Sequence, residues 1–569
     1  MKKLALYMLG AAVVLSGCND ILDSDPYDQF TKDIYFTSET NVEMFANYFY
    51  SEFSGYGNSG SYGNYYFNNL NDDQGTTGLA SWSFTAVPAT AAAWNTPYTE
   101  IRRANTLIAA LPDVESMSET KKAHWMGVAR LYRGWQHFKL VRAYGNCYYV
   151  DKELDSSDED VLYGPRQDRN TVMDRVLEDL NYAVGNISEN GTSRTAINVY
   201  VAQAMKAQVC LFEGTYSKYV LGDASRASKY LTEAKAACDA IMNSGQYQLN
   251  SSYHANFNSL DLSGNKEMIL YKKYIYGTLA HSTIDYTCGS TQVNGMSKAA
   301  FDSYLFIDGL PKATTKCDTS EAGVLVNFDD KAGFGPQDHI DISALLAQRD
   351  PRLSDQIDHI LMFPGSGYAR FGGAQSTSGT GYGVLLFDTD LISTANRQSI
   401  SGNDTDAPIF WLAEILLDYA EIQAELGAIT QSDLDKTINL LRDRAGMPHL
   451  TLTPQPDPAN NMGVSDLIWE IRRERRVEMM YAQNDRYYSL QRWNQLDKLD
   501  TAKYPDQARG AYVGNFAGTS LLEQVTVDAD GYINCSNGNT RTYDSKYMLF
   551  PIPSGQRDLN PQLDQNPGW

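Results

Sequence analysis

Residues 171–184, TVMDRVLEDLNYAV, and residues 195–214, TAINVYVAQAMKAQVCLFEG, decide the fold. Apolar residues recur in both segments at the three- and four-residue spacing of an α-helix, and the second segment closes near Gly214. Two helices of this length, with small residues at their crossing points, are typical of a tetratricopeptide-like pair. We therefore predict an all-α dominated fold in which such pairs form a superhelical scaffold.

The same pattern continues outward in both directions. Before the pair, the segment 97–112 predicts one helix and the residues after Ser118 predict another; after it, a third long helix ends at Gly245. Towards the C-terminus we expect a helix over 406–427, with Pro408 in its first turn and Gly427 at its end. A further helix over 432–446 is predicted to have Ser432 and Asp435 as a capping pair and Gly446 as its stop.

Long irregular stretches rich in Gly, Ser, Asn, Asp and aromatic residues interrupt the helices. Loops of such length are uncommon in globular proteins and usually carry function. We therefore expect a large loop-rich part that carries the ligand surface. The predicted division is a signal peptide (1–17), a lipid-anchored tether (18–36), N-terminal helical pairs with a ligand loop (37–245), an irregular ligand-facing region (246–404), and C-terminal helical pairs with a tail (405–569).

The N-terminus predicts a membrane anchor. Lys2 and Lys3 precede an uncharged run over 4–15, which is long enough for a signal peptide and too short to span a bilayer. The run ends Leu-Ser-Gly-Cys, which resembles a bacterial lipobox with Cys18 as the lipidated residue. Acyl chains contribute roughly 0.8 kcal/mol per buried CH₂. No later segment has 18 uncharged apolar residues, so we expect a protein anchored to the membrane through Cys18.

Composition restricts the class of partner. The chain has 569 residues, a formal charge of −22 and a pI of about 4.7. Such a charge disfavours nucleic acid and anionic lipid surfaces as partners. The 38 Tyr, 8 Trp and 20 Phe supply rings for a wet binding surface, or for packing between helices.

Motifs for catalysis, metals and cofactors are missing from the sequence. It contains no HExxH, GxSxG, Walker A or dinucleotide fingerprint in a fitting context, and no CxxC. We therefore predict no enzyme activity, no metal and no cofactor. Six cysteines remain besides Cys18, and export would permit pairing. Cys288 and Cys317 are the best candidates for a disulfide, while Cys210 and Cys238 suit small buried positions.

Residues 471–494, IRRERRVEMMYAQNDRYYSLQRWN, concentrate charge on a predicted helix. Glu474, Glu478 and Tyr481 are three and four residues apart and share one face. Arg486 and Arg492 are expected to reach the carboxylates of that face. We interpret this pattern as an internal joint between helices rather than as a pair of catalytic acids.

Four features together resemble the SusD/RagB family of Bacteroidetes outer-membrane lipoproteins. They are the lipobox with CNDILDSDP, WNTPYTEIRRANTLI at 94–108, the stretch 471–494 that ends in Arg-Trp, and the terminus YMLFPIPSGQRDLNPQLDQNPGW. The ordered set covers the whole chain. The resemblance implies a cell-surface protein of the outer membrane that binds oligosaccharides, or in some members peptides. It also implies a role as the hinged lid and partner of a TonB-dependent, SusC-like transporter.

Three functions stay open at this point. A glycan-binding lid leads, a peptide-binding lid is the alternative, and a helical-repeat scaffold without a small ligand is the third. An aromatic shelf would favour glycan, whereas an electropositive cleft or a strand-like groove would favour peptide. For the shelf we predict aromatic residues on loops and polar neighbours that accept hydroxyl groups. These predicted ligand residues are Trp82, Tyr286, Phe334, Tyr368 and Phe371, with Asn69, Asp72 and Asp73 as acceptors.

Overall fold

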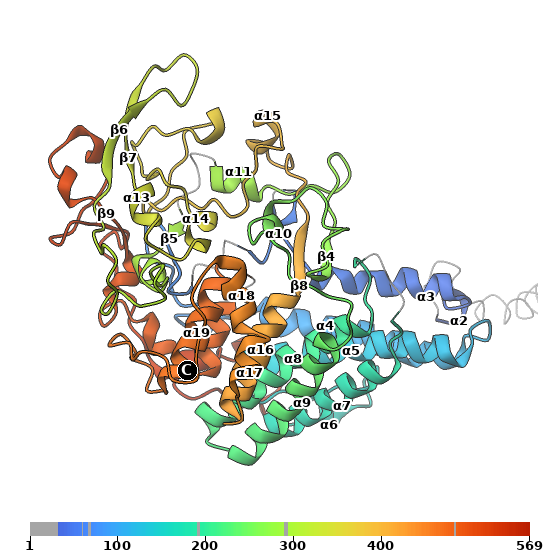
Figure 1. Cartoon of the computed structure of the whole chain (residues 1–569). Helices are drawn as coiled ribbons and strands as arrows, with labels where there is room; N and C mark the ends of the chain where they lie inside the picture. The colour runs from blue at the N-terminus through green and yellow to red at the C-terminus, as the bar shows by residue number, and fades with distance from the viewer. Residues whose placement is uncertain (1–31, 60, 66–69, 190–193, 289–293, 483–484) are drawn as a thin grey trace, which may run out of the picture.

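Helices dominate the structure, a computed structural model that describes residues 32–59, 61–65, 70–189, 194–288, 294–482 and 485–569 (Figure 1). Within this part of the chain the strands form only two-stranded antiparallel sheets. The prediction of an all-α dominated fold is therefore confirmed.

The N-terminal helices pack in chain order. Neighbours in contact are α4 with α5, α5 with α7, α7 with α8, and α8 with α9. Local sequence explains where they begin, because the side chains of Ser118, Asn198 and Asp223 accept hydrogen bonds from the first turns of α5, α8 and α9. The bounds are α4 (Ala92–Ala110), α5 (Glu119–Tyr144), α7 (Arg169–Asn186), α8 (Val199–Tyr216) and α9 (Ala224–Met242).

Helix α8 ends two residues beyond Gly214, close to the predicted end. The helix runs on to Tyr216 and continues as a π-helical turn over Ser217–Leu221. A Cβ atom on Gly214 would lie 2.7 Å from Cγ of Leu231 in α9. The glycine therefore permits the close crossing of the two helices.

The C-terminal helices join this array although they lie far away in the sequence. The helix α16 (Leu412–Glu425) contacts α8 and α9, and α19 (Asp466–Glu478) contacts α16. A shorter helix, α20 (Asp485–Arg492), packs on α8. Figure 1 shows the orange C-terminal helices beside the green ones. The scaffold is thus assembled from both ends of the chain.

Pro408 lies in a strand and not in a first helical turn. Residues Ala407–Trp411 form β8, which pairs with β4 (Met268–Lys272), and α16 begins only at Leu412. All five residues of β8 are buried. A short buried run with aromatic residues suits a strand as well as a helix, and the distant partner β4 decides between them.

The predicted helix over 432–446 is two helices. Thr430 forms a capping box with Asp433 at the start of α17 (Gln431–Asp435), two residues before the predicted capping pair. The chain then turns into α18 (Ile438–Ala445). Gly446 follows at a φ of 70°, which confirms it as the stop.

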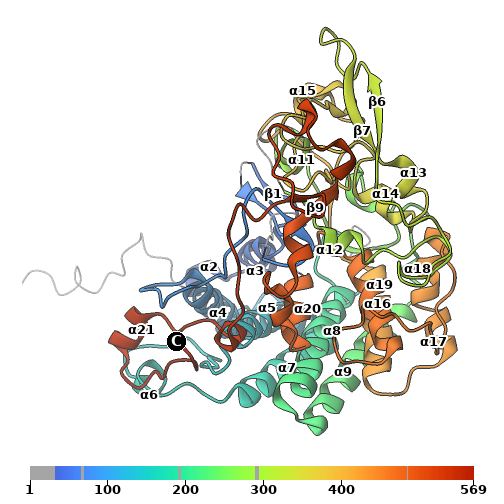
Figure 2. The same ribbon diagram turned by 90° about the vertical axis from the view of Figure 1, so that its left-hand side faces the viewer.

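A loop-rich part lies on one side of the helices. Its most prominent feature is the hairpin of β6 (Val324–Phe328) and β7 (Gln337–Asp341), which projects at the top of Figure 2. The remaining short elements are α2 (Lys32–Tyr35), α3 (Glu39–Ala46), α6 (Glu159–Leu162), α10 (Ala255–Asn258), α11 (Thr283–Cys288), α12 (Lys298–Phe301), α13 (Ser343–Leu346), α14 (Arg352–Gln356), α15 (Thr394–Arg397), α21 (Ser554–Leu559), the 3-10 turns η5 (Leu496–Leu499) and η6 (Pro505–Ala508), and the pairs β1–β2 (Gly57–Asn58, Ser61–Tyr62), β3–β5 (Gln74–Gly75, Gly295–Met296) and β9–β10 (Arg509–Tyr512, Tyr532–Asn534).

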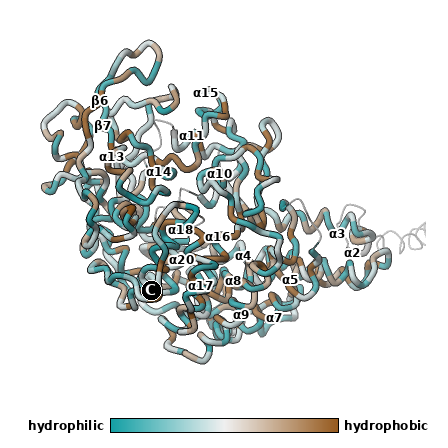
Figure 3. The backbone as a smooth tube through the Cα atoms, viewed as in Figure 1, coloured by the Kyte–Doolittle hydropathy of each residue, from teal (hydrophilic) through white to brown (hydrophobic). Residues whose placement is uncertain are grey.

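Polar and apolar residues alternate along the helices (Figure 3). One large apolar core lies among α4, α5, α7, α8 and α9, and a second lies under the loop-rich part and reaches α16, α18 and α19. Among the described residues, no helix combines the length and the apolar character that a bilayer crossing requires.

Candidate functional site

A cavity of about 430 Å³ lies beside α19. The helix contributes Trp469, Arg472 and Arg473 to its wall. The loop before α19 supplies Asn461, and the turns around η5 and η6 supply the facing side with Tyr504. Segments from three parts of the C-terminal region therefore meet around this cavity.

The lining combines aromatic rings with polar groups. Trp469 is half-buried, and its Nε1 donates a hydrogen bond to Oδ2 of Asp457 at 3.2 Å. Tyr504 is also half-buried, and its hydroxyl accepts a hydrogen bond from Nζ of Lys498 at 2.7 Å. Asn461 is exposed at the rim. Ring faces suit the C–H side of a pyranose, and amide or carboxylate groups suit its hydroxyls.

Cationic side chains outnumber carboxylates in the lining. The carboxylates are already paired: Asp457 with Arg473, Asp72 with Arg486 at 2.7 Å, and Asp302 and Asp506 with Lys298 outside the cavity. The cationic residues are Arg472, Arg473, Arg476, Arg486, Lys498 and Lys503, and the anionic ones are Asp72, Asp302, Asp457 and Asp506. All four arginines of the lining are paired with carboxylates as well, so the excess of positive charge lies at Lys498 and Lys503.

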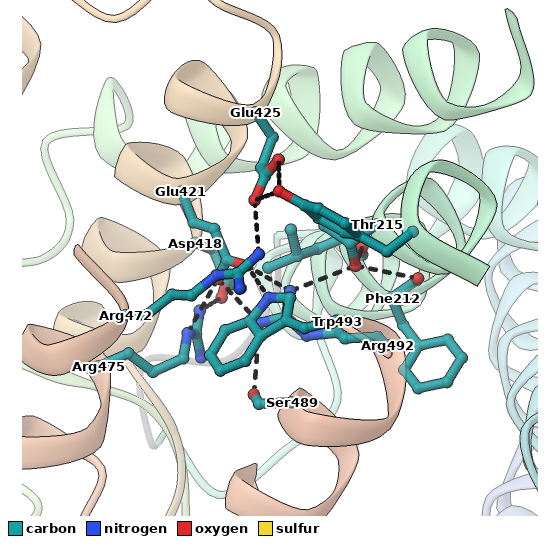
Figure 4. A network of polar contacts seen from close by, with 12 residues as sticks. Phe212, Thr215, Asp418, Glu421, Glu425, Arg472, Arg475, Ser489, Arg492 and Trp493 are labelled. Atoms are coloured by element: carbon teal, nitrogen blue, oxygen red, sulfur yellow. Dashed lines mark hydrogen bonds and ion pairs between the residues drawn. The ribbon is translucent and has the colours of Figure 1, made fainter. Parts of the chain in front are cut away.

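Arg472 and Arg475 of α19 also enter a buried network of ion pairs with α16, here called the joint, which Figure 4 shows. Glu421 of α16 lies at its centre and accepts hydrogen bonds from Arg492 at 2.8 Å, Trp493 Nε1 at 2.7 Å and Arg475 Nε at 3.2 Å. Burial by itself would raise the pKa of Glu421, but the guanidinium groups of Arg492, Arg475 and Arg472 outweigh burial and lower it to about 2.

The expected partners within the joint were wrong. Glu474 pairs with Arg352 at 2.7 Å and with Arg442 at 2.9 Å instead of with Arg486 or Arg492. The sequence pattern placed the carboxylates correctly on one buried helix face. The arginines that reach them come from α14 and α18, which are remote in sequence and adjacent in the fold.

Trp82 is not an exposed platform. Its ring stacks on Tyr547 with centroids 4.3 Å apart, and its Nε1 donates to the carbonyl oxygen of Thr542 at 2.7 Å. Only 7% of the residue is exposed. The C-terminal tail covers the loop on which sequence reasoning placed this ligand residue.

Asp72 and Asp73 are buried ion-pair partners rather than free acceptors on a solvated loop. Asp72 pairs with Arg486, and Asp73 pairs with Arg476 at 2.7 Å. Burial would raise the pKa of Asp72, but Arg476 and Arg486 outweigh burial and hold it well below its usual value. Asp72 still contributes to the cavity wall. Asn69 and Cys18 lie outside the described residues.

The two predicted tyrosines are packed to different degrees. Tyr368 is buried against Ile360 and Met362, and burial raises its pKa above the usual range. Tyr286 is half-buried at the edge of the second core. Neither side chain lines the cavity beside α19.

Phe334 and Phe371 remain exposed, with 56% and 51% of each residue accessible. A cation lies close to each ring: Nζ of Lys331 is 4.9 Å from the Phe334 centroid, and the Arg397 guanidinium is 4.7 Å from that of Phe371. Their loops are tied together because the Ala369 amide donates to Asp330 Oδ2 at 2.5 Å. Neither residue belongs to the cavity wall.

The predicted disulfide is not formed in the structure, because Cys317 carries a free thiol. The side chain of Cys288 lies outside the described set. Cys210 and Cys238 are buried thiols in α8 and α9, as expected, and burial raises the pKa of Cys210 to about 12.

Except for Asp72, sequence reasoning missed the residues of the cavity as ligand residues. Trp469, Tyr504 and Lys503 lie in a part of the chain that was assigned to helical pairs and a tail. A compositional signal was present, because the loop over 451–465 is rich in Pro, Asn and Gly and directly precedes the most charged helix. Nothing in the sequence brings 498–507 to the same place.

Comparison with known proteins agrees with this architecture. A SusD-like carbohydrate binding protein of Bacteroides fragilis superposes with a TM-score of 0.68 at 20% identity, over 93% of this chain and 100% of that structure. A second SusD-like protein of that species superposes with a TM-score of 0.65 at 20% identity, over 96% and 100%. These identities establish the fold alone.

A "SusD-like protein" of Bacteroides ovatus is 25% identical over 48% of this chain and 50% of its own length. The chain thus matches about half the length of that curated relative. The family model described as "Starch-binding associating with outer membrane" matches residues 20–211. The model described as the SusD family matches residues 266–569. Because this second match covers more than half of the chain, the protein belongs to the SusD family.

Proposed function

We propose that this protein captures oligosaccharides at the cell surface of the outer membrane, where Cys18 carries its lipid anchor. The observation that carries the proposal is the 430 Å³ cavity, which combines two half-buried aromatic rings with a polar rim. The family descriptions, which refer to starch binding and to the outer membrane, support it. A SusD-like neighbour is also described as carbohydrate binding.

Binding in this cavity requires no catalytic step. A pyranose ring that lies on Trp469 would expose its hydroxyl groups to Asn461 and to the charged groups beside it. The ring of Tyr504 offers a second contact on the facing wall. The rings are held in place by the hydrogen bonds from Trp469 to Asp457 and from Lys498 to Tyr504, so little ordering is needed on binding.

Calorimetric titration of the full-length chain tests the proposal. The detergent must lack a sugar head group, and panels of neutral and acidic oligosaccharides are titrated in parallel. We expect one glycan class to bind and Trp469→Ala to lower its affinity by about tenfold or more. Tyr163→Ala, an exposed aromatic residue on another face, is the matched control and is expected to bind normally. Retained affinity in a folded Trp469→Ala variant contradicts the site.

A peptide ligand is the second candidate, because the cavity is electropositive. This property distinguishes a peptide-binding lid from a neutral aromatic shelf. A peptide panel in the same titration separates the two functions. If peptides bind and no glycan binds, the function is peptide capture and the proposal of glycan capture is wrong.

We further propose that the protein acts as the lid of a TonB-dependent, SusC-like transporter. Apolar side chains are exposed on the helical side, with Leu162 and Leu559 accessible to 39% and 72%. They lie close together, because Asn560 Nδ2 donates to the carbonyl oxygen of Leu162. We expect Leu162→Glu with Leu559→Glu to abolish co-purification with the neighbouring transporter, and unchanged co-purification contradicts this surface.

A further inference from the structure

We propose that the cavity beside α19 selects glycans that carry an acidic group, either a carboxylate or a sulfate. This inference rests on the proposed function, because it names the ligand class of the same site. It goes beyond carbohydrate binding in general by assigning a charge to the ligand. Three features of the wall carry it: the excess of cations, donors without partners, and the absence of competing free carboxylates.

The local charge differs in sign from that of the whole protein. Six cationic and four anionic side chains line the cavity, whereas the whole chain carries −22. Salt screens exposed charges beyond about 8 Å at physiological ionic strength, so the wall rather than the net charge governs a bound group. An anionic group in this cavity therefore meets mainly cations.

Two buried guanidinium groups lie behind the wall. Arg472 and Arg473 are 2% and 7% exposed, and within the described chain neither Nε has a hydrogen-bond partner. One terminal nitrogen of Arg473, Nη2, is shared between Asp457 and Glu470, the latter at 3.2 Å. Both Nε atoms are themselves buried, so the donors that a ligand in the cavity can reach are those of the lysines at the rim.

Lys503 adds a mobile cation at the rim. Its side chain is exposed, and the described part of the chain offers its ammonium group no hydrogen bond or ion pair. Lys498 donates hydrogen bonds to neutral acceptors, the Asn461 carbonyl oxygen at 2.8 Å and the Tyr504 hydroxyl at 2.7 Å, and Asp497 lies 3.9 Å from its ammonium group. Charge-assisted hydrogen bonds to carboxylate or sulfate are about twice as strong as neutral ones.

The carboxylates of the wall do not compete for these donors. Asp302 and Asp506 are paired with Lys298, and Asp506 also pairs with Arg509 at 3.2 Å. Asp72 is held by Arg486 and Arg476. Helices, 3-10 turns and loops surround the cavity, and none of its described lining residues belongs to a strand, the element along which an extended peptide would pair. An acidic glycan therefore fits better than an acidic peptide.

The experiment titrates the full-length chain with four probes of similar length: an oligogalacturonate, a sulfated oligogalactose, a neutral oligogalactose and an oligoglutamate peptide. We expect an acidic glycan to bind at least about tenfold more tightly than the neutral one at low salt. The advantage is expected to shrink between about 0.05 M and about 0.5 M salt. The carboxylated and sulfated arms identify which anion the site prefers.

Variants of the rim test the location. Lys503→Glu is expected to weaken binding of the acidic glycan by about tenfold and to leave neutral binding unchanged. Lys503→Gln is expected to have a smaller effect in the same direction. Lys266→Gln, an exposed lysine outside the cavity, is the matched control. Among the described residues the Lys503 ammonium group makes no hydrogen bond or ion pair, so these variants are expected to fold.

The outcomes separate this inference from the proposed function. Equal affinity for neutral and acidic glycans overturns the charge selectivity and leaves glycan capture intact. Acidic binding that is insensitive to salt and to Lys503→Glu overturns the site. Binding of the oligoglutamate alone, or of no probe at all, overturns both proposals.

Discussion

Helix α19 borders two regions that use cationic side chains in different ways. On one side, Arg475 enters the buried joint, where it pairs with Asp418, Glu421 and Asp485. On the other side, Arg473 reaches the cavity wall and keeps an Nε donor without a partner among the described residues. Both arginines are held by carboxylates and stabilise the fold, whereas recognition falls to the exposed lysine at the rim of the cavity, Lys503.

The largest effect is expected in the joint. Glu421→Ala removes the acceptor of Arg492, Arg475 and Trp493 and leaves buried cations uncompensated. We expect a loss of about 3–5 kcal/mol of unfolding free energy, measured by denaturant titration. Glu119→Ala, whose side chain is 92% exposed, is expected to change stability by less than about 0.5 kcal/mol. A Glu421→Ala variant as stable as the parent would show that the joint is not structural.

A second effect concerns Trp82, whose ring is buried against Tyr547 and therefore serves the stability of the fold. Trp82→Ala removes the stack on Tyr547 and is expected to cost about 3 kcal/mol of stability. The folded fraction is expected to bind glycan with unchanged affinity. Thermal denaturation and titration of the same sample measure both quantities. Lost binding with unchanged stability would instead restore Trp82 as a ligand residue.

A smaller effect on stability is expected at Glu414, which is buried at the edge of the joint. Gln208 donates to one of its oxygens at 2.7 Å. Burial first, and then Asp418 and Asp485, raise the pKa of Glu414 well above 4.5. Its protonated form is therefore favoured in the folded state, and the stability that this form contributes below pH 4.5 is lost as pH rises through the folded pKa.

Glu414→Gln imitates the protonated carboxyl and removes that loss. We expect it to raise the melting temperature by about 1–3 °C at neutral pH. The difference between variant and parent is expected to vanish near about pH 4, in melting curves recorded across pH. A variant that is less stable than the parent at neutral pH would contradict the assigned protonation state.

The smallest effect is expected on the exposed surface around Phe371. Phe371→Ala is expected to change stability by less than about 0.5 kcal/mol, because the ring buries little area. Binding in the cavity beside α19 is expected to be unchanged in the titration. A marked loss of glycan affinity would make this surface part of the ligand site.

The sequence by itself determined the helical class, many helix ends and the family. Ser118 and Gly446 act where the pattern predicts them, because capping depends on residues within a few positions. Apolar spacing is equally local, so the repeated helices could be predicted from it. The buried, charged character of α19 was also visible in its own residues.

Only the tertiary structure decided which residues are available to a ligand. Asp72 and Arg486 lie 414 positions apart and still form an ion pair, and the distant tail covers Trp82. The strand at Pro408 exists because β4 lies beside it. The cavity forms only because the fold brings Trp469 and Tyr504 to opposite sides of the same space. Exposure and pairing depend on contacts between remote segments, and local sequence patterns carry no information about which segments meet.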